Sequence, residues 1–167
     1  MVLRYYLYMD NGRICIFNKY MDLYSRKIIS WVLSNTLEAK WVIEAVNKAK
    51  VVRKVEKPLV LHSDRGIQYV CKEYININAT EGMERSYSKK AYPWDNACIE
   101  SFHALIKREW LNRFKITDYE HAYRLIFEYI ETFYNTVRIH SHCGYVSPNE
   151  YEKGYRKKLV EMEFKSA

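Results

Sequence analysis

The chain has 167 residues, of which 49% are apolar, and it carries a formal net charge of +7. This length fits one domain with a sizeable core. The lack of an apolar run of about 18 residues argues against a membrane span. The residues after Met1 lack the apolar stretch of a signal peptide. We therefore expect a cytoplasmic protein, and its basic charge favours an anionic partner.

The N-terminal part of the chain predicts a β-hairpin. Strand-like segments run from Tyr5 to Met9 and from Ile14 to Met21, and the dipeptide Asn11-Gly12 between them is typical of a two-residue turn. In that register, Leu3 lies opposite Tyr20.

A third strand, a helix and a buried strand are expected next. The strand runs from Lys27 to Leu33, and Asn35-Thr36-Leu37-Glu38 resembles a helix cap with Glu at the third helical position. Pro58 to Leu61 is a short apolar segment that stops at Asp64, and Gly66 supplies the exit turn. Asp64 is therefore placed at the carboxyl end of a strand.

The middle of the chain predicts a helix from about Gln68 to Ala79, a strand from Met83 to Tyr87 and a second helix after Trp94. Asp95 or Asn96 can cap this second helix, with Glu100 in its first turns. The apolar positions expected to be buried along it are Ile99, Phe102, Leu105, Ile106 and Phe114.

The order of these elements predicts an α/β protein with a mixed five-stranded sheet flanked by helices. Three antiparallel strands come first, and right-handed crossovers make the two later strands parallel to the first. Such sheets bind ligands at the carboxyl ends of strands. Asp64 lies at one of these ends.

The C-terminal part predicts one helix from about Ile116 and another that begins at Ser147-Pro148-x-Glu150, a typical helix start. His140, His142 and Cys143 lie close together, but no second ligand pair accompanies them, so a polar loop is favoured over a metal site. The four cysteines form no C-x-x-C pair.

Several short motifs resemble a known family. HSDRG followed by QY, then WDNA, then ESF and a Lys seven residues after the Glu are similar to the integrase-core (DDE) transposases of bacterial insertion sequences, OrfB type, which are relatives of retroviral integrase. The resemblance implies an RNase H-like fold. We expect the integrase core to span residues 1–152, with its first strand truncated, and residues 153–167 to form a tail.

The resemblance also implies a site and its ligands. The family uses an Asp, Asp, Glu triad on two divalent ions, Mg²⁺ or Mn²⁺, to cut and join DNA, and Asp64 and Glu100 match the second Asp and the Glu. The implied partners are insertion-sequence ends and target DNA. A homo-oligomer, or association with a full-length transposase, is expected.

The chain departs from the family at the first Asp. That residue lies some eighteen positions before the Asp of an Asp-Leu-x-Ser-Arg motif, here Asp22, and so falls near Leu3 or Arg4, where no Asp stands. We expect an N-terminally truncated or decayed core that binds its ions weakly, because no carboxylate bridges them. Asp22 is a substitute carboxylate only if it reaches across a diagonal of roughly 7–8 Å, so a structural role is favoured.

Basic residues surround the predicted site, and the residues expected to bind DNA are Lys89, Lys90, Lys107 and Arg108. Glu100, His103 and Lys107 share a helix face, which without the resemblance indicates a solvated, salt-bridged surface. His62 and His103 are interpreted as structural or DNA contacts rather than general bases.

Two functions stay open at this point. The first is a DNA transposase, inactive in the present form because the first catalytic Asp is missing. The second is a non-catalytic DNA-binding remnant or inhibitor that associates with a full-length transposase.

Overall fold

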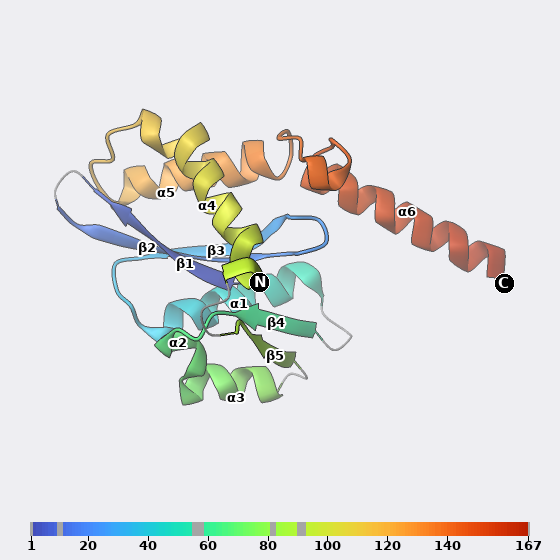
Figure 1. Cartoon of the computed structure of the whole chain (residues 1–167), viewed down its shortest axis with the longest axis horizontal. Coiled ribbons are helices and arrows are strands. Elements are labelled where there is room, and N and C mark those ends of the chain that lie inside the picture. The colour runs from blue at the N-terminus through green and yellow to red at the C-terminus, as the bar shows by residue number, and fades with distance from the viewer. Residues whose placement is uncertain (1, 10–11, 55–58, 81–82, 90–92, 167) are drawn as a thin grey trace.

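A computed structural model of the chain describes residues 2–9, 12–54, 59–80, 83–89 and 93–166. Figure 1 shows a twisted sheet with helices α4 (Ala97–Glu109) and α5 (Tyr119–Phe127) on one face and α1 (Ala39–Arg53) and α3 (Lys72–Thr80) on the other. In the described part of the chain, no helix is long and apolar enough to cross a membrane.

The sheet has five strands in the order β3-β2-β1-β4-β5. Strands β1, β2 and β3 are antiparallel, whereas β4 and β5 run parallel to β1. This arrangement confirms the predicted mixed sheet. The strand bounds are Val2–Tyr8 for β1, Ile14–Met21 for β2, Ile28–Ser34 for β3, Leu59–Ser63 for β4 and Met83–Tyr87 for β5.

The predicted hairpin register is wrong by one residue. Leu3 pairs with Lys19 rather than Tyr20, and the backbone N–H of Met9 donates to the carbonyl of Arg13 over 2.9 Å. The connection is therefore three residues long, because Gly12 takes a left-handed conformation with φ +77° that closes such a loop. Residues 10 and 11 lie outside the described part. A one-residue slip exchanges the two faces of a strand, so position 3 no longer shares a face with Asp22.

The helices differ from expectation at their ends. The single helix predicted from Gln68 to Ala79 is two, α2 (Ile67–Val70) and α3, because Cys71 between them is extended with ψ 153°. Glu38 is the residue just before α1 rather than its third residue, and it accepts from the Thr36 hydroxyl over 2.7 Å. The predicted capping box there does not form.

The last helix, α6 (Pro148–Ser166), confirms its predicted start. The backbone N–H of Ser147 donates to Glu150 Oε2 over 3.0 Å, and the backbone N–H of Glu150 lies 3.3 Å from Ser147 Oγ. This reciprocal pair is a capping box. The helix continues without interruption past residue 152, across the boundary expected between core and tail.

Two apolar clusters hold the layers together. One lies between the sheet and α4 and α5 and includes Phe17, Phe102 and Ile126; the other, on the opposite face, includes Val46 and Tyr74. Most of the apolar positions predicted for α4 are buried or half-buried. Phe114 is 42% exposed instead, because α4 ends at Glu109 and a short 3₁₀ turn intervenes.

Candidate catalytic site

Asp64 follows the last residue of β4 directly, as predicted. Its Oδ1 accepts a hydrogen bond from the backbone N–H of Gly66 over 2.9 Å. A Cβ at Gly66 would lie 2.5 Å from the amide of Gln68 and 3.0 Å from Asp64 Oδ1. A side chain at position 66 would therefore displace the Gln68 amide, whereas glycine lets the turn hold the carboxylate at the strand end.

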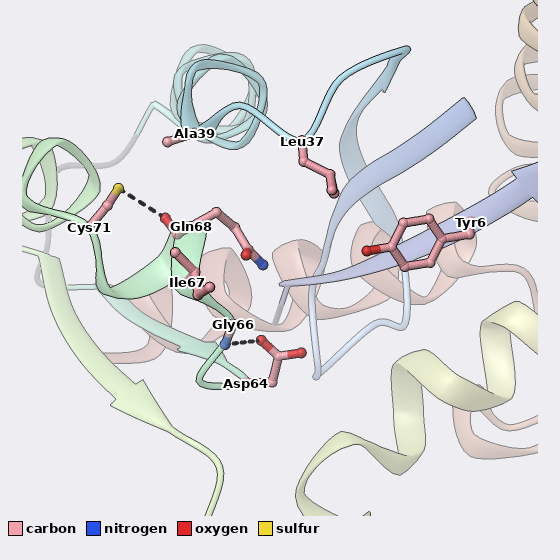
Figure 2. A pocket seen from close by; sticks show the side chains of 8 residues that line it. All are labelled: Tyr6, Leu37, Ala39, Asp64, Gly66, Ile67, Gln68 and Cys71. Carbon is pink, nitrogen blue, oxygen red and sulfur yellow. Dashed lines mark hydrogen bonds between the residues drawn. The ribbon is translucent and has the colours of Figure 1, made fainter. Parts of the chain in front are cut away.

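A cavity of about 620 Å³ opens beside Asp64. Figure 2 shows the Asp64 carboxylate and the Gln68 side chain on one side of it and Tyr6, from β1, on the other. Leu37 and Ile67 add apolar walls. The carboxylate therefore faces a space that a ligand can enter.

Strand β1 begins next to Asp64. Val2 pairs in parallel with Ser63, the last residue of β4, so positions 3 and 4 continue β1 just beyond the point where β4 ends. Here the family's first Asp was expected, and here the sequence has Leu3 and Arg4. Their side chains lie outside the described part of the structure.

Glu100 is exposed in the first turn of α4, and a hydrogen-bond chain ties this turn to the end of β4. The backbone N–H of Ser88 donates to the carbonyl of Ser63 over 2.9 Å, and the Ser88 hydroxyl donates to Asn96 Oδ1 over 2.9 Å. Asn96 is the residue just before α4, but its side chain makes this link instead of capping the helix. The resemblance implies that the Asp64 and Glu100 carboxylates lie close together, and this stays a prediction.

The predicted DNA contacts divide into three groups. Lys107 and Arg108 are exposed in the last turn of α4, about two turns from Glu100. Lys89 is exposed just after β5. Lys90 lies outside the described residues.

The two histidines near the site have local partners or a buried environment. His62 Nδ1 lies 2.9 Å from the hydroxyl of Ser86, and its Nε2 lies 3.2 Å from that of Ser88. Burial, followed by the charges of Lys19 and Lys107, lowers the pKa of His103 to about 2. His103 is therefore neutral at physiological pH.

Lys19 is a buried charge that sequence reasoning missed. It is fully buried in β2, and its Nζ lies 4.6 Å from the ring centroid of Phe17 and 6.0 Å from that of Phe102. Burial lowers its pKa well below the usual value. Alternate residues of a strand share a face, and Phe17 and Met21 on either side of position 19 are apolar, so the sequence could have placed Lys19 on the core-facing side.

Asp22 belongs to an ion network at the other end of β2. Its Oδ2 lies 2.8 Å from Arg53 Nη2, and its Oδ1 accepts from the backbone N–H of Tyr24 over 3.0 Å. Arg53 also pairs with Glu152, which lies 3.3 Å from Lys27. The network joins β2, α1 and α6, so the Asp22 carboxylate is engaged in structural contacts.

The carboxylates of Asp64 and Glu100 are hard oxygen donors of the kind that Mg²⁺ prefers. Within the described ranges, however, no group of three or more His, Cys, Asp or Glu side chains is placed to hold a metal ion. These residues fit a single ion in donor type. They do not fit a pair of ions bridged by a third carboxylate.

Residues 2–93 match the family model described as "Integrase core domain", and residues 81–148 match a second model with the same description. The chain belongs to the integrase core family. This integrase core is 38% identical over 133 residues to the transposase for insertion sequence element IS904 of Lactococcus lactis, covering 80% of the chain and 53% of that protein. It is 34% identical over 147 residues to the transposase InsF for insertion sequence IS3A of Escherichia coli, covering 88% and 51%.

The integrase core thus spans about half the length of the curated relatives it matches. Its fold is also that of solved integrases and transposases. It matches a chain of the simian T-cell lymphotropic virus intasome with a TM-score of 0.72 and 12% identity, over 90% of this chain and 52% of that one. The catalytic core of HTLV-2 integrase, solved with magnesium, matches with a TM-score of 0.62 and 13% identity, over 83% and 85%. The predicted RNase H-like fold is confirmed.

Proposed function

We propose that this chain is the core part of an insertion-sequence transposase and that it acts in DNA transposition. The observation that carries the proposal is the pairing of Val2 with Ser63, which sets the start of β1 beside Asp64. Identity to two insertion-sequence transposases supports it. In this proposal Asp64 and Glu100 are the catalytic carboxylates and the metal ligands, and they bind divalent ions, Mg²⁺ or Mn²⁺, weakly because no third carboxylate bridges a pair. The substrates are the ends of the element and target DNA, and the chain works as an oligomer or with a full-length transposase.

The basic residues at the ends of α4 and β5 bind the DNA backbone in this proposal. Lys107 and Arg108 are exposed on the same helix as Glu100, and Lys89 is exposed at the strand beside β4. The sequence adds Lys90. Such contacts supply sequence-independent affinity that falls with salt, because each neutralised phosphate releases counterions.

We also propose that the chain, with its present residues, does not join DNA strands. A two-ion displacement needs both ions close together, about 3.5–4 Å apart, and their mutual repulsion is lowered by a carboxylate between them. Leu3 and Arg4 provide no such carboxylate. Asp22 does not replace it in our proposal, because Arg53 and the turn after β2 hold its oxygens.

The substitution Arg4→Asp tests this account. Alternate strand residues share a face, so a carboxylate at position 4 falls on the face of Tyr6, which lines the cavity beside Asp64. We expect strand transfer with Mn²⁺ or Mg²⁺ to appear in Arg4→Asp and to be absent from the parent chain. The assay uses a labelled element end and a plasmid target.

Leu3→Asp is the control for position, because it adds a carboxylate on the opposite strand face and should stay inactive. Adding Glu100→Gln to Arg4→Asp should abolish the restored activity. Strand transfer by the parent chain, lost in Asp22→Asn, would show that Asp22 is the substitute carboxylate and would refute the inactivity. If every variant bound DNA but none joined strands, the catalytic roles of Asp64 and Glu100 would be refuted, and the proposed DNA binding would stand.

A second function, a non-catalytic unit that associates with a full-length transposase, is favoured by the missing carboxylate in an otherwise complete sheet. It predicts that the parent chain lowers strand transfer by a full-length relative such as the IS904 transposase when the two are mixed. Co-purification of the two proteins is the direct measurement. Unchanged transfer at excess chain would exclude this function for that pairing.

A further inference from the structure

A second cavity, of about 460 Å³, lies on the side of α4 that carries Ser101. It shares no lining residue with the cavity beside Asp64 among those described. Three chain segments build it: the first turns of α4, the turn between β2 and β3, and the segment from Tyr134 to His142. The polar residues that line it are Arg26, Ser101, Arg138, His140, Ser141 and His142.

The charge of this cavity is positive. None of the described residues that line it carries a carboxylate. Glu109, which does not line the cavity, neutralises Arg138: the Nε and Nη2 atoms of Arg138 each donate to a carboxylate oxygen of Glu109 over 2.7 Å. Arg26 has no such carboxylate partner among the described residues, and its Nη2 lies 3.4 Å from His142 Nδ1. The uncompensated charge of the cavity is therefore that of Arg26.

The Arg26 guanidinium also holds an unused donor. Its Nη1 is out of contact with solvent and finds no hydrogen-bond acceptor in the described part of the protein. Leaving a buried charged donor without an acceptor is costly, and such groups are rare in native structures unless a ligand or water satisfies them. The guanidinium therefore has hydrogen-bonding capacity that the described protein groups do not use.

The backbone around Arg26 is fixed in a strained conformation. Arg26 has φ 60°, in the left-handed region that side chains other than glycine seldom adopt. Its carbonyl accepts from the hydroxyl of Tyr134 over 3.0 Å, and the carbonyl of Ser25 accepts from the thiol of Cys143 over 3.3 Å. Strain that persists because its surroundings enforce it is found preferentially at ligand sites.

We infer that this cavity binds a phosphodiester group of a DNA backbone, with Arg26 as its principal contact. A guanidinium presents parallel donors that match two phosphate oxygens, and the hydroxyls of Ser101 and Ser141 are further donors of the type that contacts phosphates. The inference rests on the proposed action on DNA. It adds a phosphate contact that is independent of Lys107 and Arg108.

The position of the cavity favours a nucleic acid over a free anion. Ser101 and Ala97 line it, and Glu100 lies between them on the same turn of α4. One helical turn advances about 5.4 Å. A DNA strand whose scissile phosphate lies at Glu100 therefore has neighbouring phosphates within reach of the cavity.

The test compares Arg26→Gln with Arg124→Gln. Both remove one positive charge, but Arg124 is exposed on α5 and does not line the cavity. Gln at position 26 retains the aliphatic stem and the left-handed strain. Binding of a labelled duplex is measured by fluorescence anisotropy across a range of NaCl in EDTA, so that the result does not depend on metal or on catalysis.

We expect Arg26→Gln to weaken duplex binding about tenfold and to lower the log–log salt slope by about one, as for one lost phosphate contact. Arg124→Gln should change neither quantity. Equal effects of the two variants, with binding still lowered by Lys107→Ala, would overturn the cavity proposal and leave the proposed function intact.

Two further measurements keep the test decisive. If thermal unfolding shows that Arg26→Gln is misfolded, Arg26→Asn takes its place, because Asn tolerates the left-handed conformation and removes the same charge, and unchanged binding in this variant overturns the proposal. Inorganic phosphate is titrated against the ring proton signals of His140 and His142. Shifts in a chain that does not bind the duplex would overturn the DNA assignment and show a free-anion site.

Discussion

At the residue scale, Lys19 places an ionisable side chain in an apolar part of the core. It is fully buried beside Phe17 and Phe102, and burial lowers its pKa well below the ordinary value. The folded protein therefore binds the Lys19 proton more weakly than the unfolded chain does. Because the unfolded state binds more protons, the free energy of unfolding rises with pH between the lowered pKa and the usual one.

We predict that Lys19→Met raises the free energy of unfolding at pH 7 and removes this rise. Well-packed apolar residues that replace buried charged groups are neutral or stabilise a protein by about 1–4 kcal/mol, so a gain at the low end of that range is expected. Urea denaturation at pH 7 and pH 9.5 measures both effects. Lys72→Met, at an exposed position of α3, is the control. Parallel pH dependence in the parent chain and Lys19→Met would contradict the prediction.

At the element scale, the link between β4 and α4 depends on one hydroxyl. Ser88 is buried, and its Oγ connects the end of β4 to Asn96 at the start of α4. We predict that Ser88→Ala loosens the first turn of α4, where Glu100 lies. Amide hydrogen exchange should accelerate about tenfold there, the equivalent of about 1.4 kcal/mol, which is typical for a hydrogen bond left with a buried unpaired partner.

Ser86→Ala is the matched control for this link, since Ser86 contacts His62 across β4 and β5 and does not reach Asn96. It should leave exchange in α4 unchanged. Similar acceleration by both variants would mean that general loosening of β5, not the Ser88 link, governs the helix start.

Elements of this fold differ in how well the sequence predicts them. The strands and their order follow from alternation and from crossover handedness, which need no tertiary detail. The hairpin register was wrong because Asn11-Gly12 permits loops of two or three residues, and the choice is made by the pairing of β1 with β2. The break at Cys71 was missed because no glycine or proline marks it in the sequence.

For the candidate site, Asp64 was placed by its strand end, whereas the Ser88 link joins residues whose proximity only the folded chain reveals.

At the scale of the whole molecule, the ion network of Arg53, Asp22, Glu152 and Lys27 is the main polar connection between α6 and the sheet. Burial raises the pKa of Glu152, but the hydrogen bond and charge of Arg53 outweigh it, so the pKa is lowered. A carboxyl with a lowered pKa stabilises the fold above its unfolded pKa, and this contribution is lost as pH falls through the folded pKa.

We predict that α6 detaches from the sheet in acid before the sheet unfolds. Limited proteolysis as the pH falls below about 4.3, the ordinary Glu value, should cut within α6 while the rest of the chain stays intact. Glu152→Gln should shift this cleavage to neutral pH, whereas Glu161→Gln, at an exposed position of α6, should not. Simultaneous cleavage in all regions would show that the network has no separate role.

The capping box at Ser147 and the pair of Glu152 with Arg53 secure α6 within its first turns, while residues 153–158 are exposed. Figure 1 shows the remainder of the helix projecting away from the body. With 19 residues the helix is about 28 Å long. About 21 Å of this length lies beyond Glu152, so a tilt of about 5° at the Arg53 anchor displaces the far end of the helix by roughly 1.8 Å. A small change in the loop after β2 is thereby converted into a larger movement at the far end of α6.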